Sequence, residues 1–288
     1  MKRDKKMGQI GTNSGMNWLC ASTAAAVLLA GSVAGADEAK PAEPKRIEDN
    51  SFLLEEAYNQ EPGVIQHIQT FQFNRDKTWN YSFTEEMPAG GRKHQLSATV
   101  PVQHLEGATP VSGLGDILFN YRYQLVDREE VAVSPRFSLI LPTGSVAQGT
   151  GNGVPGYQVN LPLSVMLSPS WVTHWNLGTT LTPNLASGSG RVTALSFNYG
   201  MSVIWLAAEK FNLMVEFAGA ANEKADGAGG ITRENTFFVN PGARFAIDFD
   251  SGLQIVPGIS VPIGVGPSAP QYGVFGYLSF EHSAWSGK

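Results

Sequence analysis

The chain has 288 residues, a formal net charge of −5 and 42% hydrophobic residues, with 32 glycines and one cysteine. Its mean hydropathy of −0.10 excludes a bundle of membrane-spanning helices. The acidic balance argues against nucleic-acid binding, which needs a basic surface.

The chain begins like a secretory signal peptide. Four basic residues lie within residues 2–6, and the apolar stretch 18–36 ends in the small residues Ala34, Gly35 and Ala36. This pattern predicts a signal peptide over residues 1–36 with cleavage after Ala36. The alternative is a retained anchor, because a stretch of about 19 residues is borderline for spanning a bilayer.

Removing residues 1–36 takes away four positive charges and one negative charge, which changes the net charge from −5 to −8. The only cysteine, Cys20, leaves with this segment. A mature exported chain without cysteine carries no disulfide framework, so its stability must come from elsewhere.

Residues 37–63 are acidic and contain prolines, which predicts a periplasmic tail or a plug. Glu55 and Glu56 precede the first expected strand, and we expect residues 52–61 to occupy or cap the periplasmic mouth of a basic lumen. Residues 52–60 are also a candidate for a short helix.

The rest of the chain alternates between apolar and polar residues with a period of two, which predicts strands. In the stretch 236–252, for example, Phe245 and Ile247 fall on one face while Arg244 and Asp248 fall on the other. Twelve such runs are predicted, over residues 64–73, 77–86, 94–104, 114–126, 132–142, 155–167, 171–182, 192–205, 211–222, 235–249, 252–263 and 271–282. Pro241 interrupts the tenth run and predicts a bulge or a local weak spot.

Short and long connections alternate along the chain. Tight turns are "VDREEV", "SPSW", "AAEKF" and "DFDSG", whereas "PTGSVAQGTGNGVPG", "PNLASGSGR" and "NEKADGAGGITREN" are long and rich in glycine. Transmembrane barrels sort their connections in this way, with short periplasmic turns and long outer loops. We therefore predict an all-β fold: a closed antiparallel transmembrane β-barrel of about 12 strands over residues 64–282, followed by a tail, residues 283–288.

Aromatic residues support the barrel prediction, because they gather at both ends of the expected strands. Such girdles mark the two membrane–water interfaces of outer-membrane barrels. The residues near the short turns are Trp171, Trp205, Phe211 and Phe249, and those near the long loops are Tyr157, Phe237 and Tyr272.

Four charged residues share the polar parity of their strands and lie at a similar expected height above the periplasmic turns. They are Arg122, Arg136, Glu216 and Arg244. A belt of charge at one height can set the selectivity of a pore. We expect Glu216 to neutralise Arg244, which leaves Arg122 and Arg136 as an unpaired basic patch for a carboxylate or phenolate. The alternative is that Glu216 and Arg244 form a structural pair and that the arginines hold a plug.

No catalytic, cofactor or metal motif emerges. The loop "GTGNG" at residues 149–153 lacks the Lys-Ser/Thr and the helix of a phosphate-binding loop. The 5 histidines have no metal-ligand spacing, and His174 has the parity of a lumen residue, out of reach of lipid. We therefore expect no cofactor, no bound metal and no enzymatic activity.

Three stretches resemble one family of proteins. They are "SFLLEEAYNQEPGVIQHI" (51–68), "GLGDILFNYRYQL" (113–125) and "PRFSLILPTG" (135–144). They resemble proteobacterial outer-membrane β-barrel transporters of the phenol meta-pathway degradation type. This resemblance implies an outer-membrane uptake or efflux barrel, in contact with outer-membrane lipid, for small organic and often aromatic solutes. It leaves the substrate, the direction of transport and the oligomeric state open.

Three functional hypotheses follow. The first is a channel or transporter for small organic molecules, including aromatic acids or aromatic hydrocarbons. The second is a structural or adhesive outer-membrane barrel whose loops bind outside partners. The third is a lipid-modifying barrel enzyme, for which the expected lumen position of His174 is unfavourable.

Overall fold

The computed structural model describes residue 47 and residues 49–284, all of which belong to one compact unit, residues 44–288. The predicted signal peptide and the alternative anchor lie outside the described residues. Within the described ranges, no helix has the length and apolar character needed to cross a membrane.

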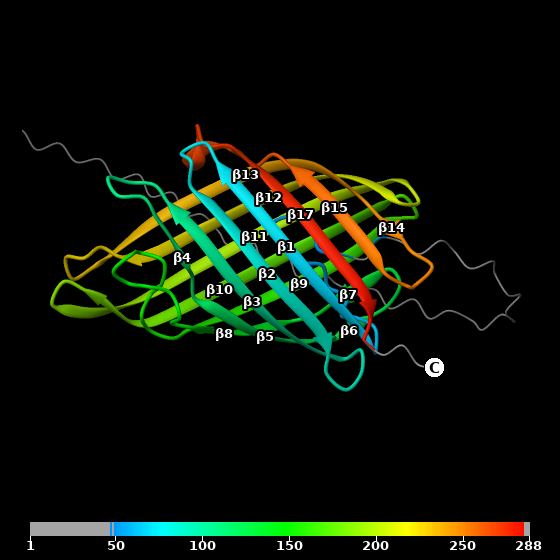
Figure 1. Ribbon diagram of the computed structural model, residues 1–288, viewed down its shortest axis with the longest axis horizontal. Helices are drawn as coiled ribbons and strands as arrows, with labels where there is room; N and C mark the ends of the chain where they lie inside the picture. Colours follow the sequence, from blue (N-terminus) through cyan, green and yellow to red (C-terminus); the bar gives the residue numbers. More distant parts are fainter. Residues whose placement is uncertain (1–46, 48, 285–288) are drawn as a thin grey trace, which may run out of the picture. The chain divides into compact units, whose positions relative to one another are not determined.

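The unit is a closed antiparallel barrel of 12 strands, as the sequence predicts (Figure 1). The last strand, β17, pairs with the first, β1, from Val64 opposite Ser283 to Asn74 opposite Gly273. This pairing closes the sheet, so the backbone groups within the bilayer are satisfied by neighbouring strands. The strand segments are β1 (Val64–Asn74), β2 (Trp79–Pro88), β3 (His94–Leu105), β4 (Val111–Leu114), β5 (Ile117–Tyr123), β6 (Val126–Asp127), β7 (Val131–Val133), β8 (Arg136–Leu141), β9 (Gly156–Ser168), β10 (Trp171–Ser187), β11 (Gly190–Ala208), β12 (Phe211–Ala225), β13 (Ile231–Phe245), β14 (Ile247–Asp248), β15 (Gln254–Ser260), β16 (Ile263–Gly264) and β17 (Gly273–Ser283).

Several of the twelve predicted runs are split into shorter segments. The fourth consists of β4, β5 and β6, the fifth of β7 and β8, the tenth of β13 and β14, and the eleventh of β15 and β16. Pro135 lies between β7 and β8, and Pro262 lies between β15 and β16. Proline has no backbone N–H to donate to a ladder, so these breaks fall where pairing is interrupted.

Pro241 lies beside one of these interruptions. It is paired with Val215 on one side, and on the other side its carbonyl accepts a 3.0 Å hydrogen bond from the amide of Val261. β15 ends at Ser260 and β16 begins at Ile263, so the irregularity lies in the neighbouring strand segments rather than in β13. The missing N–H of Pro241 is the physical reason for a gap at this point in the ladder.

The two faces of the sheet differ as the alternation predicts. On β13 and β14, Phe245 is 45% exposed and Ile247 is 41% exposed, whereas Arg244 is 2% exposed and Asn240 is fully buried. Large apolar side chains cover the outer face of the ring, and buried Asn, Gln, Ser, Arg and Glu side chains face the lumen. An outer apolar face suits lipid and a polar inner face suits a watery or occupied lumen, so the barrel is an outer-membrane barrel.

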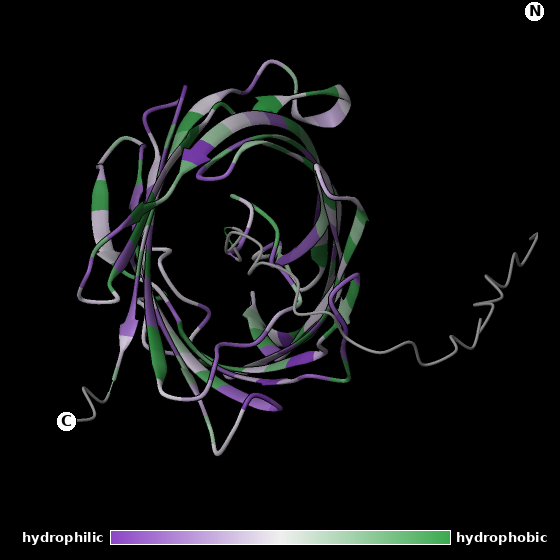
Figure 2. Cartoon of the chain, turned by 90° about the vertical axis from the view of Figure 1, so that its right-hand side faces the viewer, coloured by the Kyte–Doolittle hydropathy of each residue, from purple (hydrophilic) through white to green (hydrophobic). Residues whose placement is uncertain are grey.

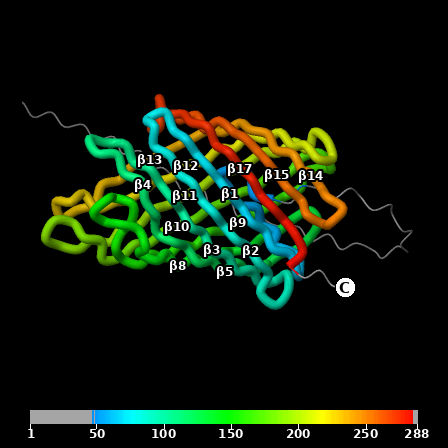
Figure 3. Tube along the Cα trace, viewed as in Figure 1, coloured from blue at the N-terminus to red at the C-terminus, as the bar shows by residue number. Residues whose placement is uncertain are grey.

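Two of the predicted long loops are wrong in detail. The stretch "PNLASGSGR" lies in a hairpin in which β10 ends at Ser187 and β11 begins at Gly190. Likewise, β12 continues to Ala225 and β13 begins at Ile231. These hairpins extend past most other strands at the left end of the view in Figure 3. Polar residues still pair their backbones beyond the apolar band, because ladder hydrogen bonds do not depend on apolar side chains.

Candidate functional site

Residues 49–61, here called the inner segment, lie inside the ring of strands (Figure 2). The segment contains bends but no helix, so the short helix expected over residues 52–60 does not form. A helix would pair these amides internally. Here, side chains of the barrel wall accept hydrogen bonds from them instead, so buried backbone groups remain satisfied.

Glu216 on β12 binds three consecutive amides of the inner segment. Oε1 accepts from the amides of Phe52 at 3.0 Å, Leu53 at 2.9 Å and Leu54 at 3.2 Å. Oε2 accepts from the Leu53 amide at 3.1 Å and from Nδ2 of Asn240 at 2.6 Å. The Glu216 side chain is fully buried. A buried carboxylate needs such donors to offset its lost hydration, so Glu216 and the segment satisfy each other.

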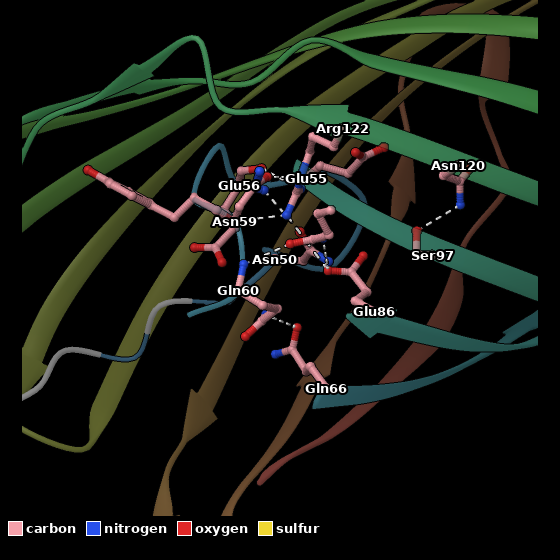
Figure 4. Close-up of polar contacts among 12 residues, drawn as sticks. Asn50, Glu55, Glu56, Asn59, Gln60, Gln66, Glu86, Ser97, Asn120 and Arg122 are labelled. Atoms are coloured by element: carbon pink, nitrogen blue, oxygen red, sulfur yellow. Dashed lines mark hydrogen bonds and ion pairs between the residues drawn. The ribbon is translucent and has the colours of Figure 1, made fainter. Parts of the chain in front are cut away.

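Arg122 on β5 binds the other end of the inner segment with all three guanidinium nitrogens (Figure 4). Nε donates to Oδ1 of Asn59 at 2.9 Å, Nη1 to the carbonyl of Glu56 at 3.1 Å, and Nη2 to the carbonyl of Tyr58 at 2.9 Å. The Nη2 atom also lies 3.7 Å from Oε2 of Glu86 on β2. Arg122 is therefore enclosed between the segment and the wall.

Arg136 on β8 forms an ion pair with the inner segment. Its Nη2 lies 2.7 Å from Oε1 of Glu55 and donates to Oε1 of Gln158 at 2.7 Å. Its Nη1 donates to Asn120 at 2.8 Å and to Ser138 at 2.5 Å. The side chains of Arg136 and Glu55 are 13% and 27% exposed, so this pair is more open than the contacts of Arg122.

Arg244 on β13 binds the beginning of the described segment through backbone carbonyls. Nη1 donates to Asp49 at 2.9 Å and also to Asn50, and Nη2 donates to Ile47 at 3.5 Å. Arg244 is 2% exposed. It thus holds the chain just before the residues that Glu216 binds.

Asp49 adds a second contact at this end. Its carboxylate accepts hydrogen bonds from the hydroxyl of Tyr277 and from Oγ of Ser279, the latter at 2.5 Å. Burial raises the pKa of the Asp49 carboxyl, and the nearby Arg244 guanidinium and these hydroxyl donors oppose the shift.

The predicted pairing of the four charged lumen residues is wrong in two respects. Glu216 lies opposite Asn240, and Arg244 lies opposite Asn212, so Glu216 does not neutralise Arg244 across the strand pair. Arg122 and Arg136 are register partners on β5 and β8, but both bind the inner segment rather than forming an unpaired patch. Arg244 lies four residues closer to the periplasmic turn than Asn240, the register partner of Glu216. The alternation of faces does not reveal this difference in height.

Neutral side chains, which the sequence analysis did not single out, also hold the segment. Oδ1 of Asn176 accepts from the amide of Glu55 at 3.0 Å, and Nδ2 donates to the Glu55 carbonyl at 2.7 Å. Gln124 makes a similar two-way contact, accepting from the amide of Asn59 and donating to the carbonyl of Ala57, both at 2.7 Å. The available signal was their polar parity, which is shared by many lumen residues.

Two glycines of the wall make room for a segment side chain. The Phe52 ring packs edge-on against Phe275 and Tyr277, with centroids 6.0 and 6.2 Å apart. A Cβ atom at Gly258 would lie 2.7 Å from Cε1 of Phe52, and a Cβ atom at Gly242 would also collide with this ring. Larger residues at either position would exclude Phe52 from its site.

Residues 47 and 49–58 contribute side chains to the walls of two cavities of the lumen. A periplasmic cavity of about 390 Å³ is lined by Glu56, Tyr58 and His174, among others. An outer cavity of about 250 Å³ is lined by Glu55 and Arg136, among others. The two sets of lining residues have no member in common.

His174 is buried in the lumen, where it pairs with Ser164. Nδ1 of His174 lies 2.7 Å from Oγ of Ser164, and this hydroxyl accepts a 2.8 Å hydrogen bond from the amide of Ala57. The Ser164–His174 pair therefore contacts the inner segment inside the lumen. Across residues 49–284, no group of three or more His, Cys, Asp or Glu side chains is arranged to hold a metal ion.

Solved structures confirm the barrel fold. The COG4313 outer-membrane channel from Pseudomonas putida F1 matches with a TM-score of 0.59 and 12% sequence identity, covering 78% of this chain and 97% of that chain. The NanC porin matches with a TM-score of 0.50 and 8% identity, covering 75% of this chain and 98% of that chain. No protein with a curated description matches the chain.

The sequence itself matches one protein family. The profile described as "Putative MetA-pathway of phenol degradation" matches residues 58–264, which is most of the described barrel. This match agrees with the resemblance carried by residues 113–125 and 135–144. The chain therefore belongs to this family of outer-membrane β-barrels.

Proposed function

We propose that this protein is an outer-membrane channel for small organic molecules and that the inner segment closes its lumen at rest. The observation that carries the proposal is that the chain inside the barrel lines two cavities of the lumen that have no lining residue in common. A solute that crosses the barrel must then pass the inner segment, so its release would open the path.

The four charged lumen residues support this proposal because they bind the inner segment rather than act only as a selectivity filter. Arg122, Arg136, Glu216 and Arg244 each bind the segment. While the segment is docked, these charges hold it in place. Once it leaves, they form a lumen belt together with Glu86, which lies 3.7 Å from Arg122, and the resulting three positive and two negative charges favour the passage of anions.

Small aromatic solutes are the substrate class that we favour. The family description refers to phenol degradation, and the outer cavity combines Arg136, Glu55 and Glu86 with apolar and hydroxyl side chains. Such a mixture suits aromatic acids better than large polar sugars. Aromatic hydrocarbons are the second candidate class within this proposal.

Single-channel recording in planar bilayers tests the proposed closure. Deleting residues 37–61 should increase the conductance or the fraction of time open, because the segment no longer occupies the lumen. Deleting only residues 37–46 is the matched control, since it leaves the inner segment in place.

The contrary results are also specific. If both deletions leave conductance unchanged in a folded barrel, the segment does not close the lumen. A membrane that stays silent with every variant favours a structural or adhesive barrel, and hydrolysis of lipid in detergent micelles would favour an enzyme.

A further inference from the structure

The three lumen arginines differ in how accessible they are to a small molecule in the outer cavity. Arg122 and Arg244 are 3% and 2% exposed, and their contacts with the inner segment go largely to backbone carbonyls. Arg136 instead lines the outer cavity and binds the segment through the carboxylate of Glu55. Of the three, Arg136 is therefore the one whose segment contact a small anion in the outer cavity can replace.

The guanidinium of Arg136 has an unused donor. Its Nη1 and Nη2 atoms make hydrogen bonds with the wall, and Nη2 also contacts Glu55, but its buried Nε has no hydrogen-bond partner among the described residues. A buried N–H without a partner has a free-energy cost. Glu55 contacts Nη2 but not Nε, whereas a bidentate carboxylate could bind both nitrogens.

The remaining walls of the outer cavity suit an aromatic ring. Phe52, Leu118 and Ile68 offer apolar surface, while Thr84 and Thr99 offer hydroxyl groups. Glu86 also lines this cavity, and its carboxylate lies 3.7 Å from Nη2 of Arg122. The two threonine hydroxyls lie 2.9 Å apart and bond to each other, so they need no ligand. The cavity volume of about 250 Å³ limits the occupant to a small molecule.

We propose that the outer cavity binds a small aromatic monocarboxylate at Arg136 and that Glu55 is an internal competitor for the same guanidinium. This inference rests on the proposed function, because the cavity is taken as the entrance to the transport path. The ligand carboxylate occupies the Nε–Nη2 edge, and its ring lies against Phe52 and Leu118.

Displacement of Glu55 also affects the inner segment. The Glu55 carboxylate keeps a 3.1 Å contact with Nδ2 of Asn160, and Asn176 still holds its backbone. The ligand therefore removes the ion pair without removing every contact of the segment. Binding and partial loosening of the segment are coupled, because one guanidinium edge cannot hold both carboxylates.

The test is a titration of the folded, detergent-solubilised protein with benzoate, followed by calorimetry. Glu55→Gln should bind benzoate roughly tenfold more tightly than the wild type, because the internal competitor has lost its charge. Arg136→Gln should lose binding, and Arg136→Lys should retain only weak binding, since lysine keeps the charge but lacks the planar fork.

Controls test separately the charge of the ligand, its aromatic ring and the folding of each variant. Benzamide has the same ring without the charge and should bind far more weakly than benzoate, and acetate has the charge without the ring and should also bind weakly. Arg191→Gln on the outer end of β11 is the matched arginine control and should bind benzoate like the wild type. A gel shift between boiled and unboiled samples establishes that each variant is folded.

The outcomes distinguish this site from the proposed channel closure. Benzoate binding that is equal in the wild type, Arg136→Gln and Glu55→Gln would overturn the site, even if deletion of residues 37–61 opens the channel. Conversely, the expected ranking of affinities would support the site even if that deletion leaves conductance unchanged, in which case only the closure is wrong.

Discussion

At the scale of single residues, the lumen is organised around the backbone of the inner segment. Glu216 accepts three consecutive amides, and Arg122 and Arg244 donate to carbonyls. Peptide groups of the segment thus satisfy most of the contacts of these buried charges, and Arg122 also lies 3.7 Å from Glu86 of the wall. Removing such a charge leaves peptide groups without partners, which costs more than losing an exposed surface pair.

We predict that Glu216→Gln weakens docking of the inner segment while the barrel stays folded. The amide keeps one acceptor, but its NH₂ group now faces the donors of Leu53 and Asn240 that Oε2 satisfies. A hydrogen bond to a charged group contributes roughly 1.5–3 kcal/mol, so the open fraction should rise by about tenfold or more. Single-channel recording measures this fraction.

Glu223→Gln is the control on the same strand. Glu223 lies near the outer end of β12 and pairs with Arg233 at 2.5 Å, outside the lumen contacts of the segment. Channel behaviour should match the wild type. Equal opening in both variants would show that the carboxylate of Glu216 is not what holds the segment.

At the scale of elements, the barrel has a regular band with more variable ends. β10 and β11 pair without interruption from Trp171 to Thr182, and their register shifts only beyond Thr182. The outward side chains Trp175 and Leu177 of this band are 45% and 63% exposed and suit lipid. Beyond the shift, the hairpin is polar, so it contributes little burial in the membrane.

We predict that the outer end of the β10–β11 hairpin is dispensable for barrel closure. Thr182 and Ala194 are register partners, so residues 183–193 can be replaced by an Asn-Gly turn, which suits a two-residue hairpin. The temperature at which the folded band disappears from a detergent gel should fall only slightly.

A deletion inside the band provides the contrast. Removing residues 175–178 keeps the alternation of faces along β10, because four residues are an even number. It shifts the pairing of β10 with β9 and β11 within the membrane, so the strand becomes too short to pair along its length. This variant should lose the folded band altogether. If the two variants behave alike, the division between band and protruding hairpin is incorrect.

At the scale of the whole molecule, closure between β1 and β17 makes the ladder continuous around the ring. A closed ladder has no open edge, and in detergent its strands cannot separate one at a time without breaking hydrogen bonds on both sides. The outward apolar surface, in turn, requires lipid or detergent around it.

We therefore predict that the protein is heat-modifiable. The mature protein should migrate differently in a detergent gel before and after boiling, and it should precipitate when detergent is removed. Identical migration in both samples, together with solubility in the absence of detergent, would contradict a membrane barrel.

The sequence by itself determined the barrel. A period of two along each strand needs only local information, because successive side chains of a strand point to opposite faces. Phe245 outside and Arg244 inside follow from it, as do twelve strands and the lumen position of Glu216. The breaks at Pro135 and Pro262 carried a local signal in the missing N–H.

Only the tertiary structure decided what the lumen residues bind. Glu216 meets Phe52 across 164 positions of sequence, and Arg244 meets Asp49 across 195. Parity places a side chain on a face but does not set its height relative to a strand partner, which depends on register and turn geometry. For this reason the sequence suggested a pair between Glu216 and Arg244, whereas the folded chain offers each of them the backbone of the inner segment, whose peptide groups need partners once they are buried.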